Sequence, residues 1–89
     1  RTEFKYTVKF NFDKDHSIHE IFKMTKEPSR IISQLSLLTD YPILPNETLL
    51  IFDEIQECNS ALNSLKYFYE DSPEYVVVAA GSLLGVALT

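Results

Sequence analysis

The feature that most constrains the fold is a short apolar run that ends in two adjacent carboxylates. Leu49, Leu50, Ile51 and Phe52 are followed directly by Asp53 and Glu54. A continuous apolar run of this length predicts a strand buried on both faces, as in a parallel sheet. Ligands of such sheets bind at the carboxyl ends of the strands. We therefore expect the two carboxylates to emerge where a binding site would form.

The paired carboxylates have two interpretations. In the first, one carboxylate holds a magnesium ion and its neighbour orients or deprotonates a water molecule. That arrangement is the Walker B motif of P-loop nucleotide hydrolases. In the second, a buried strand stops at a solvated acidic turn. Short motifs match many unrelated sequences by chance, so this stretch alone leaves both interpretations open.

The periodicity of the other segments predicts an α/β fold. Residues 4–12 alternate apolar and polar side chains, which is typical of a strand with one solvated face at the edge of a sheet. The pattern further predicts helices at about 16–24, from Glu27 to about Thr39 and from Asn59 or Ser60 to about Glu70, and an apolar strand over residues 75–80. Strands that alternate with helices imply crossover connections and a parallel sheet.

Charge is unevenly distributed along the chain. Residues 1–39 hold seven basic and five acidic side chains, whereas residues 40–89 hold one and eight, within a net charge of −5. The acidic half argues against a nucleic-acid interface there. No polybasic patch suggests membrane binding either.

Cys58 is the only cysteine, which excludes an internal disulfide framework and suits a reducing compartment, so we expect a cytoplasmic protein. We see neither a signal peptide nor an apolar run of about 18 residues that could span a membrane. The chain starts at Arg1 and ends on the apolar run 83–89. We expect residues 1–89 to be part of one domain, truncated at both ends.

His16 and His19 lie three residues apart in the helix predicted at about 16–24. Such a pair could bind a metal ion, but no third ligand follows at a recognised spacing. Two solvated histidines on the polar face of the helix are the favoured interpretation.

A phosphate-binding loop of the Walker A type is missing from these residues. Such a loop needs spaced glycines followed by Lys and Ser/Thr, so that backbone N–H groups can surround the phosphates. The chain has only Gly81 and Gly85, and no lysine follows them. We therefore expect the 89 residues alone to bind magnesium-ATP poorly.

From Thr48 to Leu88 the chain resembles the AAA-type bacterial and archaeal ATPases that usually carry a C-terminal domain of unknown function. Three blocks in a fixed order carry the resemblance: residues 50–58 (LIFDEIQEC), 61–68 (ALNSLKYF) and 79–86 (AAGSLLGV). Residues 4–12 fit the strand before Walker B more loosely.

This resemblance implies roles for three residues. Asp53 would be the carboxylate on the magnesium side, and Glu54 would activate the attacking water. Ser82 would lie near the sensor position, where a polar side chain reads the γ-phosphate or the water. A simple turn cap is the alternative for Ser82. ATP and magnesium would then be ligands of the longer parent protein.

The resemblance also implies a sheet order of 5-1-4-3-2 in the intact core. Strand 2 would be Phe4–Phe12, strand 3 Leu49–Phe52 and strand 4 Tyr75–Ala80, so these residues would form a partial P-loop core with strand order 2-3-4 and three helices. The neighbour of strand 4 is absent, so its apolar edge is expected to drive self-association. The apolar run Leu83–Leu88 would add exposed surface.

Two function hypotheses follow. The first is a fragment of an ATP-hydrolysing AAA-type protein, with Asp53 and Glu54 at its catalytic centre. The second is a non-catalytic protein-interaction module that keeps the P-loop-type fold. A glycine-rich loop with Lys and Ser/Thr, encoded upstream of Arg1, would distinguish the first from the second.

Overall fold

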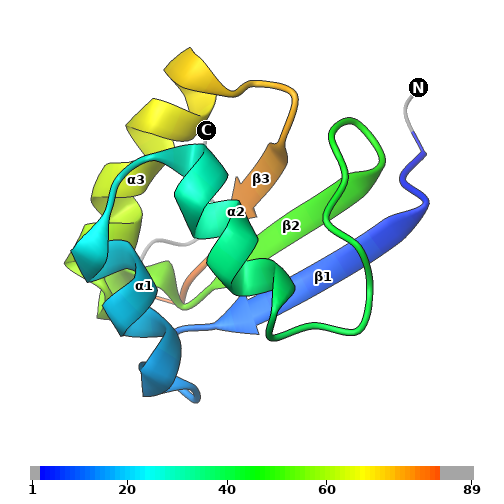
Figure 1. Ribbon diagram of the computed structural model, residues 1–89. Coiled ribbons are helices and arrows are strands. Elements are labelled where there is room, and N and C mark those ends of the chain that lie inside the picture. The colour runs from blue at the N-terminus through cyan, green and yellow to red at the C-terminus, as the bar shows by residue number, and fades with distance from the viewer. Residues whose placement is uncertain (1–2, 83–89) are drawn as a thin grey trace.

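The protein forms a three-stranded parallel sheet with helices packed against it (Figure 1). The computed structural model describes residues 3–82. Strand β1 spans Tyr6–Asn11, β2 spans Thr48–Asp53 and β3 spans Val76–Ala79, and they lie in the order β1-β2-β3. Both neighbouring pairs are parallel. The predicted α/β fold, with a strand order equivalent to 2-3-4, is confirmed.

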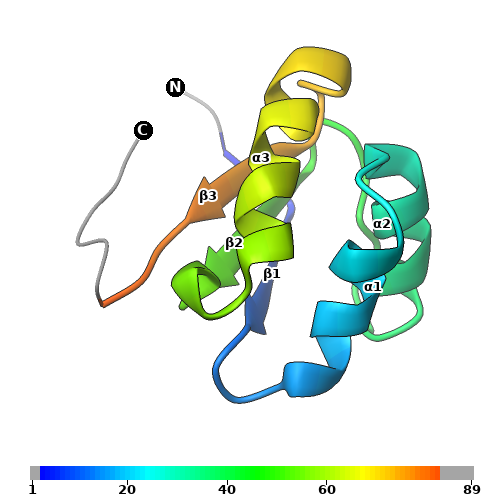
Figure 2. The same ribbon diagram turned by 90° about the vertical axis from the view of Figure 1, so that its left-hand side faces the viewer.

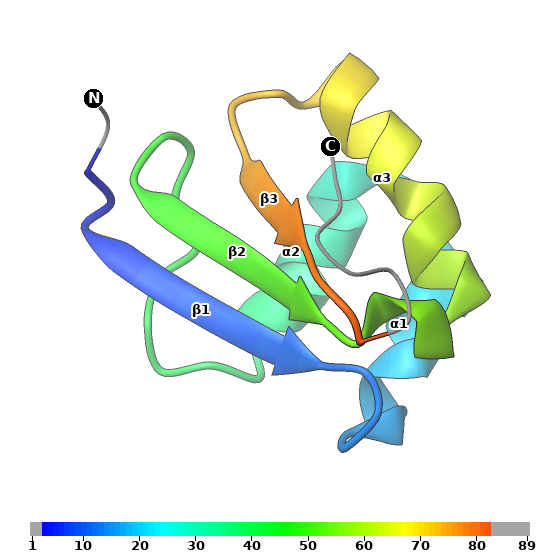
Figure 3. The same cartoon turned by 180° about the vertical axis from the view of Figure 1, so that it is seen from behind.

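Three α-helices connect the strands. Their bounds are His19–Met24 for α1, Pro28–Ser36 for α2 and Asn59–Asp71 for α3, and short 3-10 turns η1 (His16–Ile18) and η2 (Ile55–Glu57) precede α1 and α3. All three helices lie on one face of the sheet, as the views from the side and from behind show (Figures 2 and 3). Parallel crossovers are right-handed. Because both crossovers step across the sheet in the same direction, their helices arrive on the same face.

The core lies between this helical layer and the sheet. Alternate residues of the strands point into it, so that Val8 and Phe10 of β1 lie beside the fully buried Leu50 and Phe52 of β2. The Phe52 ring packs edge-to-face against four other phenylalanine rings, those of Phe10, Phe12, Phe22 and Phe68, at centroid distances of 5.5–6.4 Å. Edge-to-face packing is a favoured geometry for aromatic pairs. The central strand is thereby fixed by its last apolar residue, directly before the carboxylates.

The opposite face of the sheet corrects one expectation. In the described part of the chain no helix covers it, so Leu49 and Ile51 are only half-buried and Val78 is 45% exposed. The prediction that this strand, β2, is buried on both faces is therefore wrong for these residues. The side chains on this uncovered face are apolar, but both crossover connections of the described residues place their helices on the opposite face of the sheet.

One helix boundary differs from the sequence pattern, while the helix expected at about 16–24 is present over residues 16–24. The helix expected to reach about Thr39 ends at Ser36, and Leu37 and Leu38 are exposed. The first helix begins as a 3-10 turn, where the side chain of Asp15 accepts a hydrogen bond from Ser17 N–H. This cap satisfies a backbone donor that has no partner within the helix.

Candidate functional site

The carboxyl ends of the three strands lie at one edge of the sheet, where their arrowheads point the same way (Figure 3). Asn11 pairs with Asp53 at the ends of β1 and β2. From Ala79, the last residue of β3, the chain continues past the same edge to Ser82. The structure therefore places Asp53 and Glu54 where the sequence predicted, and it adds the residues after β3.

Glu54 is an extra residue in the ladder between β2 and the end of β3. Ala80 N–H donates to the Phe52 carbonyl (3.0 Å), and the Ala80 carbonyl accepts from Ile55 N–H (3.1 Å). In an evenly spaced parallel ladder the second donor would be Glu54 N–H. The inserted residue bends the strand as a bulge does, and Glu54 has a left-handed backbone with φ 53°. This conformation is uncommon for a residue with a side chain.

Asp53 stabilises this bend with one of its two carboxylate oxygens. Its Oδ1 accepts a hydrogen bond from Glu54 N–H at 3.0 Å, so the N–H that has left the ladder still has a partner. Its Oδ2 lies 3.5 Å from Nζ of Lys9. Lys9 of β1 lies opposite Ile51 of β2. Ile51 and Asp53 are two residues apart on the same strand, so the side chains of Lys9 and Asp53 are on the same face of the sheet. The Lys9 ammonium partly neutralises Asp53.

Three hydrogen bonds converge on one oxygen of Glu54. Gln56 Nε2 donates to Glu54 Oε1 at 2.7 Å, and both the backbone N–H and the hydroxyl of Ser82 donate to it at 3.1 Å. The bond from Gln56, followed by the Ser82 N–H bond, lowers the pKa of Glu54 below its ordinary value of 4.5, against the smaller opposing effect of partial burial. Donors that bond the charged form stabilise it. Glu54 is thus an ionised carboxylate at neutral pH.

Gln56 is held tightly between Glu54 and Gly81. Its amide nitrogen must face Glu54, because a carboxylate only accepts hydrogen bonds. Its Oε1 is buried and has no partner among the described residues. A Cβ on Gly81 would lie 2.0 Å from that oxygen. Only glycine therefore leaves room for the Gln56 side chain in this position.

The structure brings together some of the predicted site residues and adds others. Glu54 and Ser82 are in direct contact, whereas the Asp53 carboxylate accepts from the backbone N–H of Glu54 and faces the Lys9 ammonium. Lys9 and Gln56 were not identified from the sequence. The position of Gln56, two residues after Glu54 in a tight turn, was the only available signal for its role. The catalytic and metal-binding roles themselves stay predictions.

Within residues 3–82, no three His, Cys, Asp or Glu side chains are grouped closely enough to hold a metal ion by themselves. Magnesium, however, is commonly bound by one or two carboxylates together with substrate phosphates. Asp53, a partly buried carboxylate at the carboxyl end of β2, fits that mode, with Lys9 as a competing cation at its Oδ2. The His16 and His19 rings are stacked at 4.8 Å, and His19 Nε2 donates to the Phe12 carbonyl at 2.7 Å.

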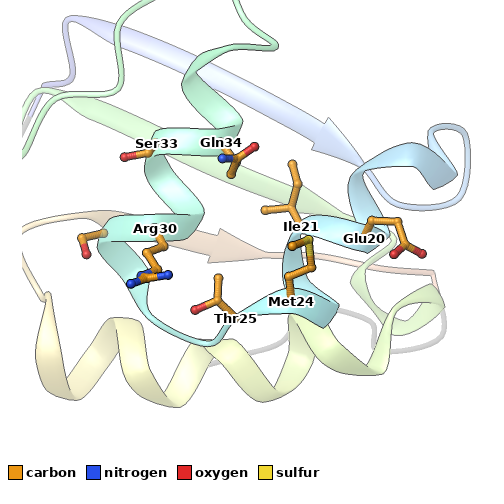
Figure 4. Close-up of a pocket in the computed structure, with 8 residues that line it drawn as sticks. Glu20, Ile21, Met24, Thr25, Arg30, Ser33 and Gln34 are labelled. Carbon is orange, nitrogen blue, oxygen red and sulfur yellow. The ribbon is translucent and has the colours of Figure 1, made fainter.

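A concave surface of about 520 Å³ lies between α1 and α2, away from Glu54 (Figure 4). Ile21 and Met24 supply its apolar part, and Glu20 and Arg30 are among its polar lining residues. Both charges already have partners: Glu20 pairs with Lys23 of α1 at 3.7 Å, and Arg30 pairs with Glu27, the N-cap residue of α2, at 2.7 Å. None of the residues that surround Glu54 lines this surface.

A buried cysteine follows the turn that contains Gln56. Cys58, which directly follows η2, is buried at 4% exposure and forms no disulfide. It lies at the N-cap of α3, where it packs into the core.

No helix in the described part of the chain combines the length and apolar character needed to cross a membrane.

Comparison with known proteins gives one match. A family model described as an AAA domain matches residues 2–89. No curated protein and no solved structure matches the chain.

Proposed function

Because the chain belongs to the AAA domain family, we propose that it contributes the Walker B carboxylates of an ATP-hydrolysing protein. In this proposal Asp53 is the carboxylate on the magnesium side, Glu54 is the general base, and Ser82 occupies the sensor position. ATP is the substrate. The loop that binds the ATP phosphates would come from residues of the parent protein outside this chain.

One observation carries the proposal: the Ser82 hydroxyl and backbone N–H contact Glu54 Oε1 at 3.1 Å across the ends of β2 and β3. A turn cap would need only local contacts, whereas Ser82 contacts a residue 28 positions away in the sequence. The contact joins a predicted base to a predicted sensor. It therefore supports the enzymatic interpretation over a solvated acidic turn.

The proposed reaction is the attack of water on the γ-phosphorus. The water oxygen forms a bond to phosphorus, the bond from phosphorus to the bridging oxygen of ADP breaks, and the water proton moves to the Glu54 carboxylate. ADP and phosphate leave, and the proton then passes to solvent. When bound, magnesium neutralises charge on the phosphates. Asp53 is the residue of this chain that would hold it.

The second candidate function is a non-catalytic interaction module with the same fold. The observation in its favour is that only Gly81 and Gly85 are present, so these residues contain no glycine-rich phosphate loop. The acidic half of the chain would then serve as a surface for protein partners. The two candidates differ in whether the full-length gene product hydrolyses ATP.

The test uses that full-length gene product with three substitutions. Glu54→Gln should retain ATP binding and lower kcat about 100-fold or more, because a positioned general base contributes that much. Asp53→Asn should weaken the magnesium-dependent part of ATP binding as well. Glu70→Gln removes an exposed carboxylate from α3 and should leave both unchanged. Native turnover by Glu54→Gln would refute the assignment, and absence of any hydrolysis by the native protein would favour the interaction module.

A further inference from the structure

We infer that Gln56 is a positioning residue for Glu54: it fixes Oε1 of the carboxylate and leaves Oε2 as the atom that accepts the proton from water. The inference rests on the proposed function of Glu54. It assigns to Gln56 and Gly81 a role in catalysis without contact between either residue and the nucleotide.

The two oxygens of Glu54 have different surroundings. Oε1 accepts all three hydrogen bonds, from Gln56 Nε2 and from the N–H and hydroxyl of Ser82. Among the described residues none donates to Oε2. A carboxylate has about two lone-pair positions on each oxygen, so Oε1 has no capacity left for a water. Oε2 is the oxygen that remains basic and available.

Gln56 supplies the shortest of these three bonds, at 2.7 Å. The carbonyl oxygen of the Gln56 amide is also confined, since Oε1 is buried against Gly81, where a Cβ would have no room. The side chain follows the buried Ile55 in η2, which anchors the turn in the core. The amide therefore approaches Glu54 from a fixed direction. Such fixation is what a general base requires, because small displacements of a catalytic group lower the rate strongly.

Gly81→Ala offers an independent way to disturb the same contact. The added Cβ would overlap Gln56 Oε1 at 2.0 Å, so the amide group that donates to Glu54 must shift. Gly81→Ala should therefore reproduce the effect of Gln56→Ala although residue 56 is unchanged. In a protein that already carries Gln56→Ala, the three atoms nearest to this Cβ are absent, so Gly81→Ala should add little further effect.

The experiment measures kcat and KM of ATP hydrolysis by the full-length gene product for Gln56→Ala, Gly81→Ala and the double variant. We expect kcat to fall about 10-fold, because the two Ser82 bonds remain, with KM for ATP unchanged. A loss confined to kcat is the result expected when a positioned base is displaced and nucleotide binding is intact. Gln34→Ala, at an exposed glutamine of α2, is the matched control and should keep the native kcat and KM.

Glu54→Gln, measured in parallel, separates the possible failures. If Glu54→Gln is inactive while Gln56→Ala keeps the native kcat, the inference about Gln56 is overturned and the proposed function stands. If Glu54→Gln is active, the proposed function fails and the inference fails with it. Should Gln56→Ala not fold, Gln56→Glu replaces it. That variant keeps the side-chain shape but its carboxylate cannot donate a hydrogen bond to Glu54, so kcat should again fall with KM for ATP unchanged.

Discussion

Ser82 donates two hydrogen bonds to a single oxygen of Glu54, from its backbone N–H and from its hydroxyl, each at 3.1 Å. The two residues follow different strands, and the bonds close the sheet edge at the carboxyl ends of β2 and β3. Since one of the two donors belongs to the backbone, Ser82→Ala would keep part of the contact. The chain conformation after β3 is therefore as important for Glu54 as the serine side chain.

The lowered pKa of Glu54 predicts how stability depends on pH. A carboxyl group with a folded-state pKa below its unfolded value stabilises the fold above the unfolded pKa, and this contribution is lost as pH falls through the folded-state pKa. Below about pH 4.5, the native chain should therefore lose melting temperature more steeply than Glu54→Gln. Circular dichroism melts of the 89-residue chain at several pH values measure this. Parallel slopes for the two proteins, with Glu70→Gln as control, would contradict the prediction.

A second prediction concerns Lys9, which lies 3.5 Å from Asp53 Oδ2 with 58% of its side chain exposed. If Asp53 is on the magnesium side, Lys9 competes with the ion for the carboxylate. An exposed ion pair is worth about 0.2–1 kcal/mol, so Lys9→Met should lower the half-saturating magnesium concentration for ATP hydrolysis by up to about fivefold. The measurement is a magnesium titration of the full-length gene product. Lys14→Met controls for the lost charge, and a higher magnesium requirement in Lys9→Met would exclude this role.

Phe52→Ala tests the core that supports the carboxylates. Phe52 is fully buried and its ring contacts four other phenylalanines. Its truncation should cost about 3–5 kcal/mol of unfolding free energy, measured by urea denaturation. Tyr69→Ala, at a side chain of α3 that is 65% exposed, should change stability by less than about 0.5 kcal/mol. Equal effects of the two substitutions would mean that Phe52 is not at the centre of the core.

A fourth prediction concerns self-association. In the described residues β3 pairs only with β2, and Val78 is 45% exposed. We expect the 89-residue chain to self-associate through residues 75–80, and Val78→Lys to weaken the association, because a charge on an edge strand opposes pairing with another chain. Light scattering during size-exclusion chromatography over a dilution series measures this. Tyr69→Lys adds the same charge on α3 and should have no effect, and a native chain that is monomeric at every concentration would contradict the prediction.

Sequence periodicity was sufficient for the elements, and the family resemblance supplied the order of the strands. The alternating pattern of residues 4–12 and the apolar runs of the other two strands specify which residues can form a sheet and which strand lies at its edge. The structure confirms β1-β2-β3 with parallel pairing. The edge at which Asp53 and Glu54 emerge followed from the same reasoning, since parallel strands end together.

The details around Glu54 could not be obtained in this way. A glutamate gives no sign in the sequence that its backbone is left-handed, a conformation usually associated with Gly, Asn or Asp. The contact of Lys9 with Asp53 depends on the strand register, and the contact of Gln56 with Glu54 depends on the extra residue in the ladder. Hydrophobic patterns identify faces of elements, but they do not specify which polar groups meet at an edge.

The burial of Cys58 has a practical consequence. It is the only thiol in the chain, and at 4% exposure a thiol-modifying reagent can reach it only when the segment around η2, residues 54–58, opens. The rate of its modification under native conditions therefore reports the free energy of that local opening. The same segment contains Glu54 and Gln56. The chain thus carries its own chemical probe for how often the surroundings of these two residues come apart, with no label to be introduced.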